Sequence, residues 1–355
     1  MKVVLDMQDR RPIWSMPPWV PGRLREALPS DGELHVVDLP ADGSGDGTAR
    51  VAPEVLDAVA DADAYLGFGI PEAVLERGRR LRWVHSGSAG VGGSLTPTLF
   101  RRSEVAFTNS AGIHAPPIAE GVVGALLHFA RGFDLAVRGQ AEGRWVQERF
   151  YEADAPVGEL AGSTVGIVGY GGIGREVARR VVPVGARVLA LKRTPPASPT
   201  ADVPSLVDGV AFPGAVELLH GQEGFRRLLR ESDAVVVCVP ETEATRGLMD
   251  AGALALMKPS AVLVNVARGG VIDEEALVEA LRAGRLRGAA LDVFTSEPLP
   301  EDHPLWSLPR VLLTPHVSGV TRGYWTREVE LIVDNLRRLR EGRPLCNLVD
   351  REEGY

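Results

Sequence analysis

The sequence predicts an α/β protein in which a doubly wound parallel sheet is inserted into a smaller α/β domain. Two observations support this prediction. Short apolar runs typical of buried strands alternate with segments of helical spacing along most of the chain. One such unit, residues 163–196, places the sequence G-Y-G-G-I-G at 169–174 between two apolar strands, 164–168 and 186–191.

The glycine-rich turn of this unit predicts a bound dinucleotide. Gly169 permits a tight turn, Gly171 lets a pyrophosphate approach the backbone, and Gly174 lets the helix pack on the strand. The free N–H groups at the start of the helix then favour the anion. A glycine-rich turn without a ligand is the alternative, but two flanking strands at this spacing favour a Rossmann-type site.

The end of the second strand indicates the type of cofactor. NAD sites usually carry Asp or Glu there, whereas this chain has Lys192, Arg193 and Thr194. A guanidinium and a hydroxyl can bind a 2′-phosphate that a carboxylate would repel. We therefore expect NADP(H), with NAD(H) possible, and the alternative is a solvated strand end.

Composition limits the class of protein. The chain has 355 residues, enough for two domains, with 45% hydrophobic and 24% charged residues, as in soluble globular proteins. Its 39 basic and 47 acidic residues give a net charge of −8, which disfavours nucleic acid or an anionic membrane as partner. Cys238 and Cys346 form no disulfide framework or metal motif, and no signal or membrane segment is visible, so we expect a cytoplasmic protein without a bound metal.

The first hundred residues alternate strands and helices. We predict strands at 2–5, 33–37, 64–68, 81–84 and 105–108, helices at 21–28, 53–60 and 71–80, and loops at 12–21 and 41–47. After the fourth strand comes S-G-S-A-G-V-G-G at 86–93, whose small residues leave backbone N–H groups free to bind an anion. A flexible turn is the alternative.

The remaining chain continues the alternation. Residues 118–131 form a strongly apolar helix, which must be buried in a core or against a second subunit. A loose Pro/Ser/Gly region follows the second strand of the glycine unit and extends to about residue 224. We predict helices at 225–231, 251–257, 274–283 and 327–339 and strands at 234–239, 261–266, 288–292 and 311–314.

Three polar residues follow strands of the predicted sheet and form an acid/base set. Arg268, Glu297 and His316 would each be ordinary surface residues alone. Ligands of such sheets bind beyond the carboxyl ends of the strands, where these residues lie. A hydride that adds to a carbonyl leaves an alkoxide, and an imidazole can protonate it. A carboxylate can support the imidazole, and a guanidinium can bind a substrate carboxylate.

Several stretches, in order, resemble one family. They are G-Y-G-G-I-G-R-E-V-A, E-S-D-A-V-V-V-C-V-P-E-T-E-A-T-R-G-L, M-K-P-S-A-V-L-V-N-V-A-R-G-G-V-I-D-E-E-A-L, G-A-A-L-D-V-F-T-S-E-P-L and L-T-P-H-V-S-G. Over nearly its whole length the chain resembles the D-isomer-specific 2-hydroxyacid dehydrogenases, in particular the glyoxylate/hydroxypyruvate reductases. The resemblance implies hydride transfer between a nicotinamide cofactor and a small 2-ketoacid or D-2-hydroxyacid. It also implies a dinucleotide-binding domain, 110–316, inserted into a flavodoxin-like substrate domain, 1–109 with 317–355.

The resemblance assigns roles to residues of this sequence. His316 is the acid/base, Glu297 its partner and Arg268 the substrate-binding arginine, while Ser88, Ala89 and Gly90 bind the substrate carboxylate. The cofactor-binding positions are Gly169, Gly171, Gly172, Ile173, Gly174, Lys192, Arg193, Thr194, Val239, Pro240, Thr245, Val266 and Asp292. Residues 117–131 and the aromatic segment around Trp145 resemble the family's dimerisation region, so we expect a homodimer. Gly92 departs from the family, which often has Asp there, and the segment 194–225 is longer than usual.

Two other interpretations stay open at this point. One is an NAD-linked member of the same family, of the phosphoglycerate or formate dehydrogenase type. G-F-G at 67–69 offers no cation for a phosphate, and formate oxidation needs no proton relay, which favours the hydroxyacid enzyme. The other is a nucleotide-sensing corepressor, for which the sequence shows no partner-binding motif.

Overall fold

A computed structural model describes residues 1–40, 51–155, 157–204 and 211–352. The chain divides into two compact units, Met1–His114 with Val320–Tyr355, and Ala115–Gly319. We call them the first and the second unit. The functional domain boundaries that we expected, at 109/110 and 316/317, stay a prediction, and the expected loop at 41–47 lies outside the described residues.

The first unit is built on a five-stranded parallel sheet. Its strands are β1 (Lys2–Asp6), β2 (Glu33–Val36), β3 (Ala64–Gly67), β4 (Trp83–Ser86) and β5 (Ala106–Asn109). Their order is β2-β1-β3-β4-β5, and every neighbouring pair is parallel. Parallel strands with helices on both faces bury both sides of the sheet, which explains their nearly continuous apolar sequences.

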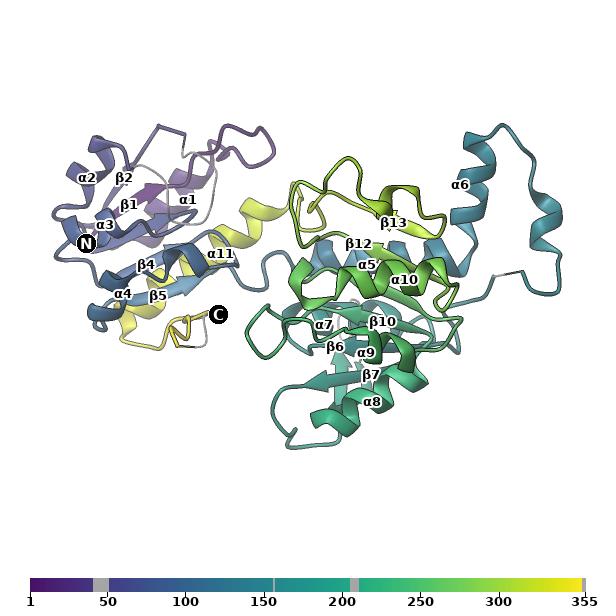
Figure 1. Ribbon diagram of the computed structural model, residues 1–355. Helices are drawn as coiled ribbons and strands as arrows, with labels where there is room; N and C mark the ends of the chain where they lie inside the picture. The colour runs from purple at the N-terminus through teal and green to yellow at the C-terminus, as the bar shows by residue number, and fades with distance from the viewer. Residues whose placement is uncertain (41–50, 156, 205–210, 353–355) are drawn as a thin grey trace. The chain divides into compact units, whose positions relative to one another are not determined.

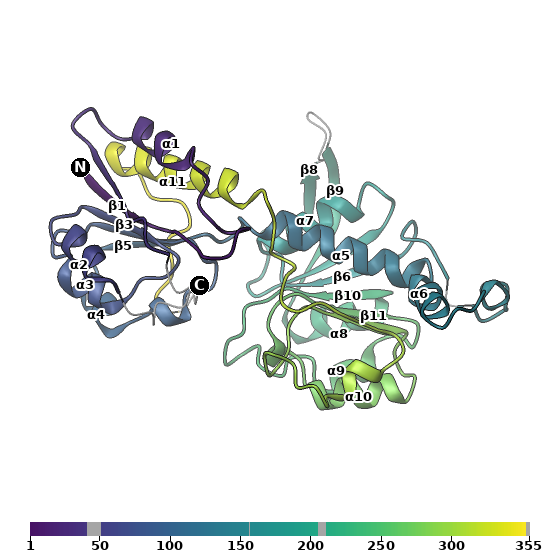
Figure 2. The same cartoon turned by 90° about the horizontal axis from the view of Figure 1, so that it is seen from above.

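Helices cover both faces of this sheet. On one face α1 (Val20–Ala27) lies beside α11 (Tyr324–Glu341), as Figures 1 and 2 show, and both contribute to a core with Leu5 and Leu66. On the other face lie α2 (Pro53–Val59), α3 (Glu72–Arg77) and α4 (Pro97–Arg101). The last helix of the chain therefore completes the core of the first sheet.

The second unit contains an eight-stranded sheet. Its strands are β6 (Thr164–Val168), β7 (Arg187–Lys192), β8 (Thr200–Pro204), β9 (Ala211–His220), β10 (Ala234–Val237), β11 (Val262–Asn265), β12 (Gly288–Leu291) and β13 (Val311–Leu313). The order is β13-β12-β11-β10-β6-β7-β9-β8, with β6 in the middle and only β8 antiparallel to its neighbour. This is the predicted doubly wound sheet, so the fold class is confirmed.

One expectation about this sheet is wrong. The region predicted to be loose up to about residue 224 instead contains two strands, β8 and β9. They precede and follow residues 205–210, which lie outside the described part. Val216 and Leu219 of β9 are buried in the cores beside β7, as is Val203 of β8. Tertiary burial of these few apolar residues outweighs the local preference of Pro and Gly for loops.

The helices of the second unit form layers on both faces of its sheet. One layer contains α5 (Ala115–Ala130) and α7 (Gly172–Val181), and the other contains α8 (Gly221–Glu231), α9 (Ala251–Leu256) and α10 (Glu274–Arg282). Beyond α5, α6 (Phe133–Ala141) and the segment after it project from the unit (Figures 1 and 2). None of the described helices is long and apolar enough to cross a lipid bilayer.

Candidate active site

The glycine turn lies between β6 and α7 at the carboxyl edge of the second sheet, with Gly171 as the N-cap of α7. Gly169 has φ +105°, a left-handed conformation that favours glycine. A Cβ on Gly174 would lie 2.3 Å from the carbonyl oxygen of Gly169, so α7 can approach the strand only without a side chain there. A Cβ on Gly171 would meet nothing within 4 Å. The turn thus has the close packing and the open backbone that a dinucleotide needs.

The residues predicted to read the cofactor ribose lie at the same edge. Lys192 ends β7, and the exposed Arg193 and Thr194 follow it directly. In the sheet register Lys192 pairs with His220, the last residue of β9. His220 was not predicted at this edge, because its strand, β9, was not expected from the sequence.

The positions predicted to line the cofactor follow β10 and β11. Val239 is one wall of the turn, since its Cγ1 would lie 2.8 Å from a Cβ on Gly169. Thr245 donates its hydroxyl to the carbonyl oxygen of Pro240 at 2.6 Å and thereby closes the loop after β10. Cys238 contacts the Gly169 carbonyl oxygen through Sγ at 3.0 Å, and burial raises the pKa of its thiol to about 12. Val266, directly after β11, bonds back to β10 through its N–H.

His316 and Glu297 come together as predicted from their chemistry. Nδ1 of His316 lies 2.7 Å from Oε2 of Glu297, and the other carboxylate oxygen accepts the N–H of Phe294 at 3.0 Å. Both side chains are partly exposed. The pairing leaves Nε2 of the imidazole for a reacting group, because Nδ1 is occupied.

Asp292 holds the segment that carries His316, a role that the sequence analysis missed. Its carboxylate accepts the Thr314 hydroxyl at 2.6 Å and the backbone N–H groups of Val317 and Ser318 at 2.9 and 3.0 Å. Its carbonyl oxygen accepts the N–H of His316, whose φ is +53°. This network stabilises an unusual backbone conformation at the predicted acid/base. The only sequence signal is a carboxylate directly after an apolar strand.

Arg268 lies on a turn that packs against the segment between Asp292 and Glu297. Gly269 has so little space that a Cβ would lie 1.9 Å from the carbonyl carbon of Phe294. Asn265, almost fully buried at the end of β11, donates to the Arg268 carbonyl oxygen at 3.1 Å and accepts from Ala267 at 3.0 Å. The guanidinium is exposed, and its Nη1 donates to the Ala267 carbonyl oxygen. The turn that carries Arg268 is therefore packed closely against the segment that leads to Glu297.

The predicted carboxylate-binding loop, residues 86–93, lies in the first unit and begins at Ser86, the last residue of β4. The Ser88 hydroxyl donates to the carbonyl oxygen of Phe68 at 2.8 Å. Ala89 and Gly90 are exposed. Among the described residues, neither of their N–H groups donates a hydrogen bond within the chain, as an anion-binding loop requires.

A doubly wound sheet with a glycine turn and a histidine–carboxylate pair at one edge is typical of nicotinamide-dependent dehydrogenases. A family model described as D-isomer specific 2-hydroxyacid dehydrogenase, NAD binding domain, matches residues 123–318. The chain belongs to this family, so the predicted family, fold and oxidoreductase class are confirmed.

Individual relatives agree with the family. The chain is 37% identical over 238 residues to (S)-sulfolactate dehydrogenase of Chromohalobacter salexigens, covering 67% of this chain and 71% of the relative. It is 32% identical over 290 residues to glyoxylate/hydroxypyruvate reductase A of Klebsiella pneumoniae, covering 80% and 85%. A crystal structure of a D-isomer specific 2-hydroxyacid dehydrogenase from Xanthobacter autotrophicus, in complex with NADPH and MES, has a TM-score of 0.73 at 30% identity, covering 100% of this chain and 99% of that one.

Proposed function

We propose that this protein is an NADPH-dependent reductase of small 2-ketoacids, which run in reverse is a D-2-hydroxyacid dehydrogenase. The observation that carries the proposal is the 2.7 Å contact of His316 with Glu297 in the unit that holds the glycine turn. The family places the chain among NAD(P)-binding oxidoreductases of 2-hydroxyacids, and the roles of individual residues are part of the proposal.

In the proposed reduction, the residues of the chain would have the following roles. A bound nicotinamide would supply a hydride, which is a proton with two electrons, to the carbonyl carbon of the substrate. His316 gives a proton from Nε2 to the carbonyl oxygen, while Glu297 holds the ring through Nδ1. Arg268 binds the substrate carboxylate and polarises the neighbouring carbonyl. In the reverse direction His316 takes the same proton from the hydroxyl group.

NADP(H) is our proposal for the preferred cofactor. The support is the run Lys192, Arg193 and Thr194 at the end of β7, where a carboxylate would instead favour NAD. The related Xanthobacter autotrophicus structure contains NADPH. Val239, Pro240, Thr245 and Val266 would line the bound cofactor, and Asp292 would bind the nicotinamide amide in addition to holding the His316 segment.

A sharp test of this choice is Arg193→Ala. A charge-assisted contact to a 2′-phosphate is worth roughly 1.5–3 kcal/mol, reduced by salt at an exposed strand end. We expect kcat/KM with NADPH to fall by about one to two decades, which is the fold-change that corresponds to this free energy. We expect kcat/KM with NADH to change little. Equal losses with both cofactors would show that Arg193 does not read the 2′ position.

We propose an unphosphorylated ketoacid as substrate. Phe68, which follows β3 at the carboxyl edge of the first sheet, packs against the rings of Tyr324 and Trp325 with centroids 6.3 Å away in each case. Trp14 adds a further ring against Tyr324 at 5.1 Å. Phe68 itself is partly exposed and carries no charge, whereas a phosphate group would favour a cation at this strand end.

We further propose a cytoplasmic homodimer. The predicted dimerisation helix α5 buries Ala119, Val122 and Leu126 in the core of its own unit. This face of the helix is therefore covered without a second subunit. The segment after it is different, since Phe133, Val137, Trp145 and Tyr151 are 51%, 56%, 88% and 70% exposed. Exposed apolar side chains of this density indicate a surface that a second copy covers. Sedimentation at micromolar concentration should give a dimer, and a monomer would contradict the proposal.

The decisive experiment for the function is a panel of 2-ketoacids assayed with NADPH and with NADH. We expect turnover of at least one small unphosphorylated ketoacid, faster with NADPH. Tight cofactor binding without turnover of any ketoacid would instead favour the nucleotide-sensing interpretation.

A further inference from the structure

The loop predicted to bind the substrate carboxylate has its carbonyl groups tied down one after another. The carbonyl oxygen of Ser86 accepts the Ser110 hydroxyl at 2.9 Å, and that of Gly87 accepts the Tyr324 hydroxyl at 2.8 Å. The carbonyl oxygen of Ser88 accepts the N–H of Ser110 at 3.3 Å. The carbonyl oxygen of Ala89 accepts the side-chain amide of Asn109 at 2.9 Å. Four consecutive carbonyl groups are therefore fixed by donors outside the loop.

These bonds decide where the exposed N–H groups point. In a planar trans peptide the C=O and the following N–H point in opposite directions. The bond from Asn109 to the Ala89 carbonyl therefore turns the N–H of Gly90 away from Asn109 and toward solvent. The bond from Ser110 to the Ser88 carbonyl does the same for the N–H of Ala89. A carbonyl that accepts a hydrogen bond also polarises its own peptide, which strengthens the N–H as a donor.

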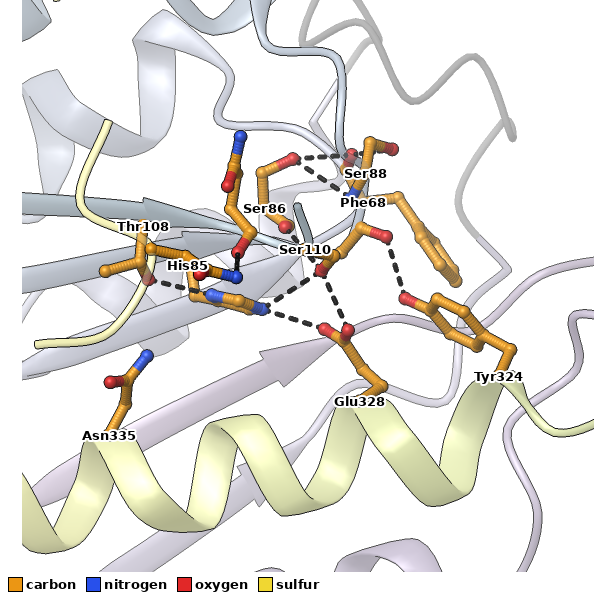
Figure 3. A network of polar contacts seen from close by, with 12 residues as sticks. Phe68, His85, Ser86, Ser88, Thr108, Ser110, Tyr324, Glu328 and Asn335 are labelled. Atoms are coloured by element: carbon orange, nitrogen blue, oxygen red, sulfur yellow. Dashed lines mark hydrogen bonds and ion pairs between the residues drawn. The ribbon is translucent and has the colours of Figure 1, made fainter. Parts of the chain in front are cut away.

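The donors are themselves held by a buried polar chain, shown in Figure 3. The Ser110 hydroxyl shares its single proton between two acceptors, the Ser86 carbonyl oxygen and Oε2 of Glu328, which lies 2.7 Å away on α11. The Glu328 side chain is completely buried. Oε1 of Glu328 contacts Nε2 of His85 at 2.8 Å, and Nδ1 of His85 contacts the Thr108 hydroxyl at 2.8 Å. Burying a carboxyl group is costly unless hydrogen bonds compensate it, so a fully bonded chain of this kind has one preferred geometry.

Asn109 is fixed in the same way. It is 3% exposed, and its Oδ1 accepts the N–H of Ala111 at 3.1 Å. Its backbone carbonyl oxygen accepts the side-chain amide of Asn347 at 3.1 Å. Because both ends of the side-chain amide are used, the orientation of its NH₂ group toward Ala89 is determined.

We propose that Asn109 and the Glu328–Ser110 pair are positioning residues that aim the amides of Ala89 and Gly90 at the carboxylate of the substrate. The proposal rests on the function proposed above and identifies what makes this loop an anion site. It uses contacts within the first unit alone. None of these residues touches the substrate, so they act on substrate binding and not on hydride transfer.

The test is the near-isosteric replacement Asn109→Asp. A carboxylate at this position still accepts the N–H of Ala111, but it cannot donate to the Ala89 carbonyl and repels it. We expect KM for the ketoacid, and the inhibition constant of oxamate with the NADPH-loaded enzyme, to rise together by about tenfold. We expect kcat to stay within about threefold and the affinity for NADPH to stay unchanged. Ser110→Ala, which removes the bond to Ser86 but keeps the backbone donor, should give a smaller rise in the same two constants.

Asn335→Asp is the matched control. Asn335 is an equally buried amide on α11, and it donates to the Cys346 carbonyl oxygen at 3.2 Å and accepts from the Cys346 N–H at 2.7 Å. Its replacement should destabilise the first unit without raising KM. If KM and the oxamate inhibition constant were unchanged in both Asn109→Asp and Ser110→Ala, or rose equally in Asn335→Asp, the proposal would be overturned while the proposed function stands. A wild-type protein that binds NADPH but neither reduces ketoacids nor binds oxamate would overturn both.

Discussion

Each unit contains a loop that we propose presents backbone N–H groups to an anion, and the two loops are shaped in different ways. In the second unit the loop after β6 is shaped by glycine itself, through the positive φ of Gly169 and the missing side chain of Gly174. In the first unit the loop after β4 is shaped by side chains outside it, through Asn109, Ser110 and Tyr324. The conformation of the first loop is determined by its own residues, whereas that of the second loop depends on residues up to 237 positions away in the sequence.

This difference separates the effects that mutations should have. Changes in the glycine turn act on the backbone directly and should affect cofactor binding and folding together. Changes around the carboxylate loop should act on substrate binding alone. The chemical step that we propose involves neither loop, because His316 and Glu297 lie on other segments of the second unit.

The largest effect should come from His316→Gln, which removes the proposed proton donor and leaves both loops intact. We expect turnover to fall by roughly 10²–10⁴-fold, the usual contribution of a general acid. Binding of NADPH and of oxamate should be unchanged, since glutamine keeps a polar side chain beside Glu297. Steady-state kinetics and fluorescence titration measure the two quantities. A loss of turnover that merely follows weaker NADPH binding would remove His316 from the chemistry.

A smaller effect is expected from Gly174→Ala in the glycine turn. The added methyl group would lie 2.3 Å from the Gly169 carbonyl oxygen, so the turn must move. Overpacking of this kind costs about 1–3 kcal/mol of stability. Urea unfolding should show that loss, and the dissociation constant of NADPH should rise by about tenfold as the turn shifts.

Gly171→Ala is the control for this experiment, because its methyl group would meet nothing within 4 Å. It should leave the free energy of unfolding unchanged, so that any loss of NADPH affinity reports the approach of the pyrophosphate. If Gly174→Ala were as stable as the wild type, the comparison between the two loops would break down.

The smallest effect concerns the carboxylates at the strand ends of the two sheets. Asp292 accepts three hydrogen bonds, while the described partner of the Asp6 carboxylate is the Tyr65 hydroxyl at 2.7 Å. Burial therefore raises the pKa of Asp6, although the bond from Tyr65 opposes the change. The folded state then holds the proton more tightly than the unfolded state. The stability that Asp6 contributes is complete below its ordinary pKa and declines as the pH rises through the ordinary value to the raised one.

Asp6→Asn should remove this decline, because an amide keeps the acceptor for Tyr65 and does not ionise. We expect the free energy of unfolding of the variant to equal or exceed that of the wild type at pH 7, by less than about 1 kcal/mol. The difference should shrink toward pH 4. Urea unfolding at several pH values measures it, and a variant less stable at pH 7 than at pH 4 relative to wild type would contradict the assignment.

The sequence was sufficient for the features that depend on local patterns. Apolar runs of four to six residues identified most strands of both sheets, and the spacing of Gly169, Gly171 and Gly174 identified the turn. The contact of His316 with Glu297 could be expected because each of these polar residues follows an apolar strand and because both match positions of the family. These signals are local, since a strand end places the next side chain at the edge of the sheet.

The parts that could not be predicted depend on long-range contacts. Glu328 was expected within a helix, but its helical position alone gave no indication that it lies 2.8 Å from His85, 243 residues earlier. His85 did carry a weak signal, as a polar residue inside an apolar strand. The strand β9 was missed because its burial depends on β7 and β8 rather than on its own sequence, which begins among Pro and Gly.

The position of α11 has a consequence for how the chain is made. The core of the first unit includes Tyr324, Trp325, Val329, Ile332 and Leu336, all contributed by this helix. A ribosome adding about 5–20 residues per second needs on the order of 10–40 s to synthesise the second unit that comes between. During that time one apolar face of the first sheet is covered by α1 but lacks α11, whereas the continuous second unit can fold as soon as it emerges. The order of folding should therefore be the reverse of the order of synthesis, and the nascent first unit is where a chaperone would be needed.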